Sequence, residues 1–330
     1  MAHAHEVAQG SEEKSAFTPK PAPAPTPPTP SGTPTPPGIP VAQGARPSIP
    51  LQPLSTPFPV PAPFPPGFAL RPALKPLPDG HVVHYRPLNE PLFALGDGDK
   101  HRVSPNDIAQ GQVGDCYFIS AVTAIALHRS EILREMITPG KQGVLKVRFY
   151  QWTPQGLEPY WVPIDRKVPI DTKTGKPAYA YAGGEEELWP MLIEKAWAAK
   201  AGSYSAVEGG NGGDAMEQIS GVPSRDYNPK QVTIEQMAAL AEQGAAMTAA
   251  TRRAWKIEIP RLNLRFGPGT DPLFASGKLV SNHEYYVLDV DPAKGTIRLG
   301  NPWGWGKEVT LTFEEFRRAF TRLSVNELQP

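Results

Sequence analysis

The chain has 330 residues, with 33 lysines and arginines against 33 aspartates and glutamates, and therefore no formal net charge. This balance removes the electrostatic basis for strong binding to nucleic acids or to anionic membranes. No apolar run reaches the ~18 residues of a transmembrane helix, and the N-terminus lacks the apolar segment of a signal peptide. We therefore expect no nucleic-acid partner and no membrane span.

Proline is concentrated at the N-terminus, where 23 of the 41 prolines lie in the first 80 residues. We predict that residues 1–75 form a disordered, proline-rich tail with a polyproline-II run at Pro21–Pro30. The run is either a solvated semi-rigid spacer or a ligand for a proline-binding partner. An export or targeting segment and a pro-region are further interpretations. The more apolar stretch Pro57–Pro65 is expected to pack on the folded part and to cover its cleft.

Regular elements are predicted only after residue 80. A buried helix begins at Cys116, because the residues after it are nearly all apolar or small, and it ends before Pro139. Two strands are predicted next, over 144–152 and 161–170. They are followed by a helix over 188–197 that ends at Gly202 and by a short helix over 234–240. The glycine-rich stretches 209–213 and 221–223 between the two helices indicate a hinge or a domain boundary. The last predicted elements are a strand over 284–290, a turn at Lys294-Gly295, a return strand over 296–299, and a helix after the capping box Thr312–Glu315.

The single cysteine, Cys116, excludes an internal disulfide and a cysteine-rich metal site. It is either a small buried hydrophobe or a reactive thiol. A helix N-terminus stabilises a thiolate by only ~0.3–2 kcal/mol, whereas lowering a cysteine pKa from ~8.5 to ~4 requires about 6 kcal/mol. A reactive Cys116 therefore needs a nearby imidazolium.

His283 is the best candidate for that imidazole, because it leads an apolar strand from which it can project into a cleft. The hairpin that turns at Lys294-Gly295 returns the chain beside its start, which places Asn301 next to His283. The Asn301 carbonyl can then orient the imidazole, and Trp303 can shield their hydrogen bond from water. Gln110 precedes the thiol and can donate to an oxyanion. Each residue alone is equally compatible with an ordinary loop or turn position.

Read together, these segments resemble the calpain family of papain-like cysteine proteases over about residues 85–320. The matching motifs are Gln110-Gly-Gln-Val-Gly-Asp-Cys116-Tyr117, Glu187-Leu-Trp-Pro190, Glu194-Lys-Ala-Trp197, Gly202-Ser-Tyr204, Glu208-Gly-Gly210, Ser220-Gly221, His283-Glu-Tyr-Tyr-Val-Leu288 and Asn301-Pro-Trp-Gly304. The resemblance implies that Cys116 is the nucleophile, His283 the general base and acid, and Asn301 the orienting residue. It also implies Gln110 as the oxyanion donor and Trp303 as the shield.

The fold implied by the resemblance is α+β, a papain-like core of two subdomains. Residues 76–221 would form a helical subdomain that carries Cys116. Residues 222–330 would form a β-rich, barrel-like subdomain that carries His283 and Asn301. Tyr117 stands where the family usually has tryptophan, and Asn282 where it usually has the glycine before the histidine.

Calcium is the one regulator that the resemblance implies, and the chemistry itself requires no cofactor. Asp107 and Glu187 match the side-chain ligands of one calcium site of the animal enzymes, and such carboxylates suit a hard cation. Ordinary structural roles for the two acids are the alternative interpretation. At the family's second site Lys307 replaces an acid, so we expect that site to be absent.

The predicted function is that of a cysteine endopeptidase that cleaves extended protein or peptide segments through an acyl-enzyme. One alternative is a catalytically silent module that binds a peptide or partner, although such a module usually lacks one of the three catalytic residues. Another is a transglutaminase-like acyl transferase, which Asn301 disfavours because an aspartate is usual there. A lone reduced cysteine favours the cytoplasm, and export without disulfides stays open.

Overall fold

The computed structural model describes residues 71–94, 103–183, 187–254, 257–259, 264–304 and 306–328. Most of the predicted tail, including Pro21–Pro30 and Pro57–Pro65, lies outside these residues. The first described residues belong to the folded part, because Ala73 N–H donates to the Gly202 carbonyl and Lys75 N–H donates to the Tyr179 hydroxyl. Composition alone had placed both residues in the tail.

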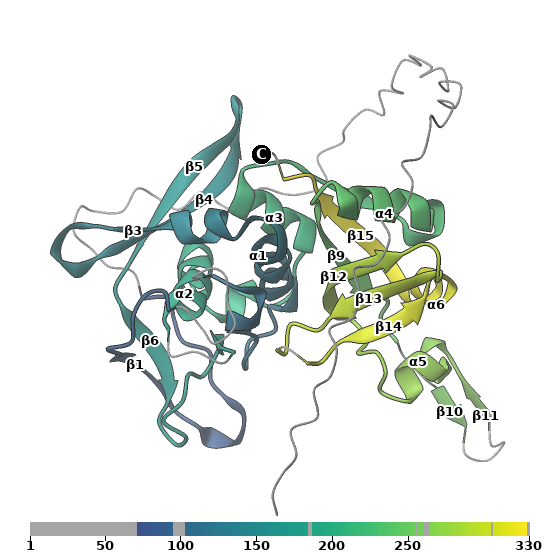
Figure 1. Cartoon of the computed structure of the whole chain (residues 1–330). Helices are drawn as coiled ribbons and strands as arrows, with labels where there is room; N and C mark the ends of the chain where they lie inside the picture. The colour runs from purple at the N-terminus through teal and green to yellow at the C-terminus, as the bar shows by residue number, and fades with distance from the viewer. Residues whose placement is uncertain are drawn as a thin grey trace, which may run out of the picture. The chain divides into compact units, whose positions relative to one another are not determined.

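Three helices form the centre of the N-terminal part (Figure 1). Helix α1 spans Cys116–Met136, α2 spans Trp189–Ala201, and α3 spans Gly212–Ser220. The expected start of α1 at Cys116 is confirmed, and a kink interrupts it at Arg129. Helix α2 ends at Gly202, as predicted, because this glycine adopts the left-handed φ of 94° that stops a helix.

Short antiparallel sheets surround these helices. Strands β3 (Ile137–Pro139), β4 (Leu145–Thr153) and β5 (Gly156–Ile164) form one sheet, β1 (Val83–Pro87) pairs with β6 (Lys167–Asp171), and β2 (Ile108–Ala109) pairs with β7 (Tyr181–Ala182). The prediction of one strand over 161–170 is wrong. The chain turns at Asp165, where the buried Lys195 ammonium binds the carbonyls of Asp165 and Lys167 at 2.8 and 2.7 Å and so separates β5 from β6.

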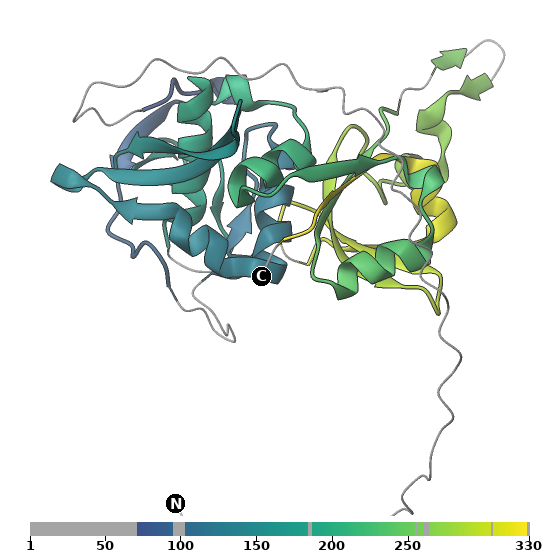
Figure 2. The ribbon, with the colours of Figure 1, turned by 90° about the horizontal axis from the view of Figure 1, so that it is seen from above.

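The C-terminal part is built on one six-stranded antiparallel sheet with the order β14-β13-β12-β9-β15-β8 (Figures 1 and 2). Its strands are β8 (Ser224–Tyr227), β9 (Ala246–Thr251), β12 (Glu284–Asp291), β13 (Thr296–Gly300), β14 (Val309–Thr312) and β15 (Phe320–Asn326). Helices α4 (Ile234–Glu242), α5 (Pro272–Ala275) and α6 (Phe313–Ala319) and the pair β10 (Ile257–Ile259) and β11 (Leu264–Phe266) complete it. Short 3-10 turns occur at Pro78–Gly80, Pro105–Asp107, Lys141–Gly143, Ser205–Val207, Pro229–Gln231 and Pro268–Thr270.

Two separate apolar cores accompany these two parts. The first takes nearly all its residues from 83–219 and the second from 232–325. The expected hairpin of β12 and β13 is present, and α6 begins with the predicted capping box at Thr312. The α+β class is therefore confirmed, and no helix of the described residues is long and apolar enough to cross a membrane.

Helix α2 holds α1 through aromatic contacts. Trp197 stacks on Phe118 with ring centroids 4.7 Å apart, and its indole N–H donates to the buried Tyr117 hydroxyl at 3.0 Å. The hydroxyl of Tyr117 thus gives α1 an acceptor for a hydrogen bond from α2.

Tyr117→Phe should lower the free energy of unfolding by about 1–2 kcal/mol, because it removes the acceptor of a buried hydrogen bond while keeping the ring. Urea denaturation measures the change. Tyr181→Phe is the control, since Tyr181 is 37% exposed. Equal stability of the two variants would show that the Trp197 bond contributes nothing.

Candidate active site

Cys116 lies where a tight loop enters α1. A Cβ on Gly111 would lie 2.0 Å from the Tyr179 carbonyl oxygen, so only glycine fits there. The backbone of Gly114 accepts a hydrogen bond from Gly209 N–H at 2.9 Å, which ties this loop to the segment before α3. The glycines of the motif thus bring Cys116 to the N-terminus of the helix.

The Cys116 thiol is not pre-activated in this structure. Burial raises the pKa of the thiol to about 11, and the backbone of Glu284 opposes this only in part. Desolvation of the charged form outweighs the helix terminus, whose contribution is only ~0.3–2 kcal/mol.

His283 and Asn301 are in contact, as the hairpin predicts. His283 Nε2 lies 3.0 Å from Asn301 Oδ1, and both side chains are buried. A carbonyl oxygen only accepts, so Nε2 carries the proton and Nδ1 is left with a lone pair. Burial lowers the pKa of His283, and its bond to Asn301 acts in the opposite direction.

Trp303 covers this pair. Its ring centroid lies 5.0 Å from that of His283, and its backbone N–H donates to Asn301 Oδ1 at 3.1 Å. Trp303 is 40% exposed, so its ring faces solvent as well as the imidazole.

Gln110 connects the thiol loop to the asparagine loop. Its backbone N–H donates to the Pro302 carbonyl at 2.8 Å, and its side-chain Nε2 donates to the Val113 carbonyl at 2.8 Å. One of the two amide hydrogens is thus engaged inside the loop, and the same side chain also acts to lower the pKa of Asp115.

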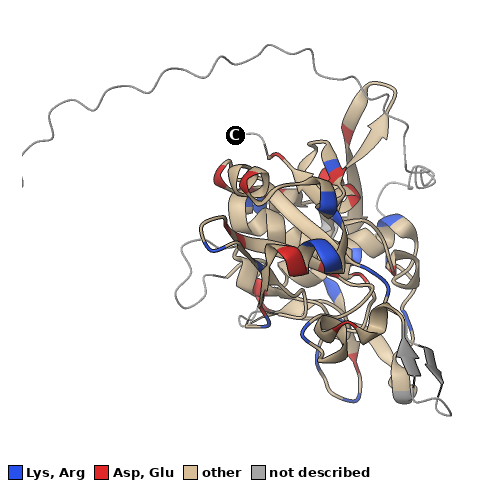
Figure 3. Cartoon of the chain, turned by 90° about the vertical axis from the view of Figure 1, so that its right-hand side faces the viewer, with Lys and Arg blue, Asp and Glu red and all other residues tan. Residues whose placement is uncertain are grey.

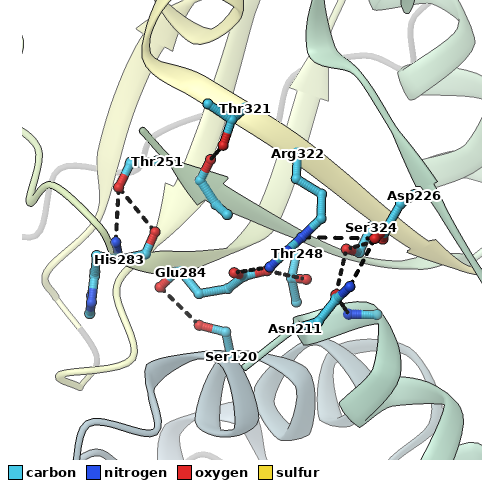
Figure 4. Close-up of polar contacts among 12 residues, drawn as sticks. Ser120, Asn211, Asp226, Thr248, Thr251, His283, Glu284, Thr321, Arg322 and Ser324 are labelled. Carbon is cyan, nitrogen blue, oxygen red and sulfur yellow. Dashed lines mark hydrogen bonds and ion pairs between the residues drawn. The ribbon is translucent and has the colours of Figure 1, made fainter. Parts of the chain in front are cut away.

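The loop before His283 is held by residues that the sequence pattern did not single out. Thr251 Oγ1 accepts from His283 N–H at 3.0 Å (Figure 4). It also donates to the Val280 carbonyl at 2.9 Å. Asn282 has a φ of 52°, the left-handed region that asparagine tolerates better than most residues other than glycine. Asparagine can therefore stand where the family usually has glycine.

Two buried carboxyl groups lie next to Cys116. Asp115 and Glu194 are 0% and 1% exposed, and each acts on the pKa of the other. Burial raises the pKa of both groups above the ordinary carboxyl range, which favours a protonated form of the pair. Their sequence signal was weak, because an acid beside a glycine and an acid within a helix are both common.

Asp107 and Glu187, the candidate calcium ligands, are also brought together. Both are buried, and burial together with the neighbouring Asp107 raises the pKa of Glu187 to about 8. Glu187 accepts from Ala94 N–H and from the Trp189 indole N–H, each at 2.8 Å. Two adjacent carboxylates fit a hard cation. No cluster of three or more His, Cys, Asp or Glu residues suited to a metal occurs among the described residues.

Comparison with known proteins identifies the family of the chain. The sequence model of the calpain family cysteine proteases matches residues 91–325. The calpain-type cysteine protease DEK1 of Arabidopsis thaliana is 32% identical over 238 residues, which cover 68% of this chain and 10% of the relative. Human calpain-9 is 27% identical over 66% of this chain and 30% of its own length. The chain thus spans well under half the length of these relatives.

Glu194→Gln tests whether the pair holds a proton, since an amide can donate to Asp115 without titrating. Both acids have raised pKa values in the folded state, so the folded protein binds more protons than the unfolded chain above pH ~4. Wild-type stability should therefore fall as pH rises toward 8. The free energy of unfolding of the variant should match that of wild type near pH 5 and exceed it at pH 8.

Urea denaturation at the two pH values measures this difference. Glu242→Gln, at an exposed position on α4, is the control and should change neither value. Parallel pH profiles for wild type and Glu194→Gln would contradict a protonated pair.

Proposed function

Because the chain belongs to the calpain family of cysteine proteases, we propose that it is a cysteine endopeptidase in which Cys116, His283 and Asn301 carry out the reaction. The observation that carries the proposal is the 3.0 Å contact between His283 Nε2 and Asn301 Oδ1 beneath Trp303. This contact leaves Nδ1 of the imidazole as the base, the state that general base catalysis requires.

In the proposed reaction, Nδ1 of His283 takes the thiol proton as the Cys116 sulfur attacks the scissile carbonyl carbon. The second amide hydrogen of Gln110 and the Cys116 backbone N–H stabilise the oxyanion. The imidazolium then gives its proton to the leaving amine, and the acyl-enzyme is released by water, whose proton His283 accepts. Burial favours the neutral thiol and imidazole, so we infer that proton transfer accompanies substrate binding.

The proposed substrates are protein or peptide segments in an extended conformation. Acidic and basic residues are interspersed along the side of the ribbon in view in Figure 3, and the chain has no net charge. Neither observation favours substrates of one charge. A catalytically silent binding module is the second candidate, and the raised pKa of the Cys116 thiol is the observation that favours it.

Wild type should hydrolyse unfolded casein, and Cys116→Ala should not, because the variant lacks the nucleophile. Asn301→Ala should lower kcat by about 100-fold, since the imidazole loses its orientation while the thiol is kept. Fluorescence release from labelled casein, with and without calcium, measures both effects. Equal hydrolysis by wild type and Cys116→Ala would contradict the proposal, and the absence of any hydrolysis would favour the binding module.

We further propose that Asp107 and Glu187 bind a calcium ion, which would relieve the repulsion between the two buried carboxylates. At ~100 times its Kd, calcium should stabilise wild type by about 2.7 kcal/mol, or ~5–10 °C in Tm. Asp107→Asn and Glu187→Gln should lose this shift, whereas Asp289→Asn, an exposed acid on β12, should keep it. Differential scanning fluorimetry in chelator and in calcium measures the shift. An equal shift in all four proteins would place calcium elsewhere.

A further inference from the structure

Glu284 is a buried carboxyl group directly beside the proposed base. It is 3% exposed and begins β12, in which the next three residues, Tyr285–Val287, are buried. Burying a carboxylate is costly unless the charge is paired, and apolar residues of similar volume often serve stability equally well. A charged residue at this position therefore calls for a reason other than stability.

The main chain of Glu284 binds the nucleophile helix. Its carbonyl accepts a hydrogen bond from Ser120 Oγ at 3.1 Å, and its backbone acts to lower the pKa of the Cys116 thiol. Cys116 and Ser120 are four residues apart and so lie on one face of α1. Strand β13 pairs with β12 only from Tyr286 onward, so the free edge at Glu284 is satisfied by the helix.

The side chain of Glu284 is anchored on the opposite side, in the sheet. Its Oε1 accepts from Thr248 Oγ1 of β9 at 2.9 Å, and its Oε2 accepts from Arg322 Nη2 of β15 at 3.0 Å (Figure 4). Helix α3 closes the site tightly, because a Cβ on Gly212 would lie 2.5 Å from Glu284 Oε1. The carboxyl group is thus fixed by three elements while its backbone is fixed by a fourth.

We propose that Glu284 is a positioning residue that, together with Arg322, holds the first residues of β12 against α1 and thereby sets His283 relative to Cys116. This inference rests on the proposed cysteine-protease function. The side chain of Glu284 contacts the sheet, and its main chain contacts α1. Glu284 therefore connects the sheet to α1 at the residue that directly follows His283.

The charge on Glu284 depends on the groups around it. They are Arg322 on β15, Asp226 on β8 and the Cys116 thiol on α1, while Asp214 on α3 faces Arg322 and Asp226. Burial raises the pKa of Glu284 to about 7, and Arg322 opposes the rise. The ion pair with Arg322 is therefore complete above neutral pH and is lost as pH falls through 7.

The test compares wild type, Glu284→Ala, Glu284→Gln and the control Glu308→Gln, which alters a carboxylate paired with Arg298 elsewhere in the sheet. One readout is kcat and KM on unfolded casein from pH 6 to 8.5. The other is the rate of alkylation by iodoacetamide, which reports on Cys116 alone because the chain has a single cysteine. Circular dichroism identifies variants that do not fold.

Glu284→Ala should lower kcat by about 10–100-fold with KM within about twofold, since a small displacement of catalytic groups costs this much. Its thiol should be alkylated severalfold faster at pH 8, because the seam with α1 opens. The kcat of Glu284→Gln should match that of wild type at pH 6, where Glu284 is itself neutral. At pH 8.5 it should be about tenfold lower than that of wild type, which is the effect of losing one charge-assisted hydrogen bond. Glu308→Gln should match wild type throughout.

The proposal would be overturned if both Glu284 variants had the kcat and the alkylation rate of wild type. It would also be overturned if Glu308→Gln lost as much kcat as the Glu284 variants. If Glu284→Ala does not fold, the pH dependence of Glu284→Gln decides. If wild type hydrolyses no casein, the proposed function fails, and alkylation still decides the inference. A change in thiol reactivity confined to the Glu284 variants would then support the positioning role, and an unchanged reactivity would refute it.

Discussion

The seam between the N-terminus of α1 and the first residues of β12 is the constraint on which the candidate site depends. The thiol and the imidazole come from segments far apart in the chain, and the elements that follow them contribute mainly to different apolar cores. Main-chain contacts of Glu284 with Cys116 and Ser120 connect them at this seam. A second connection runs from the Gln110 N–H to the Pro302 carbonyl, so that the thiol loop and the asparagine loop meet as well. Hydrogen bonds of this kind are directional, which is why they can set the relative placement of two parts that apolar packing alone would leave less precisely defined.

Buried acids are the second feature of this region, and each is accommodated differently. Asp115 lies beside Glu194, Glu284 is paired with Arg322, and Asp107 lies against Glu187. Each arrangement reduces the cost of placing a carboxyl group away from water, which would otherwise amount to several kcal/mol. Their raised pKa values mean that the folded protein retains protons that the unfolded chain would release near neutral pH. The buried acids around Cys116 are thus less favourable for the stability of the fold than apolar residues would be at the same positions.

Much of the architecture could be predicted from local sequence. The start of α1 at Cys116, the end of α2 at Gly202 and the β12–β13 hairpin follow from apolar periodicity and from glycine positions, which act over a few residues. The contact between His283 and Asn301 follows from that hairpin, because the register of two antiparallel strands determines which residues meet. Strand β9 was missed because its sequence, Ala246–Thr251, has no alternation: most of its residues are buried between neighbouring strands. The break between β5 and β6 was missed because it depends on Lys195, a residue of a distant helix.

The sequence by itself determined which residues can take part in the chemistry and the order in which they occur. It determined the α+β class, the hairpin that joins the imidazole to the amide, and the membership of the calpain family that the comparisons then showed. Only the tertiary structure decided that the thiol is desolvated and that Glu194 lies behind Asp115. It also decided that Glu284 joins α1 to the sheet. The physical reason is that burial and pKa depend on groups brought together from distant segments, whereas propensity and periodicity depend on neighbours along the chain.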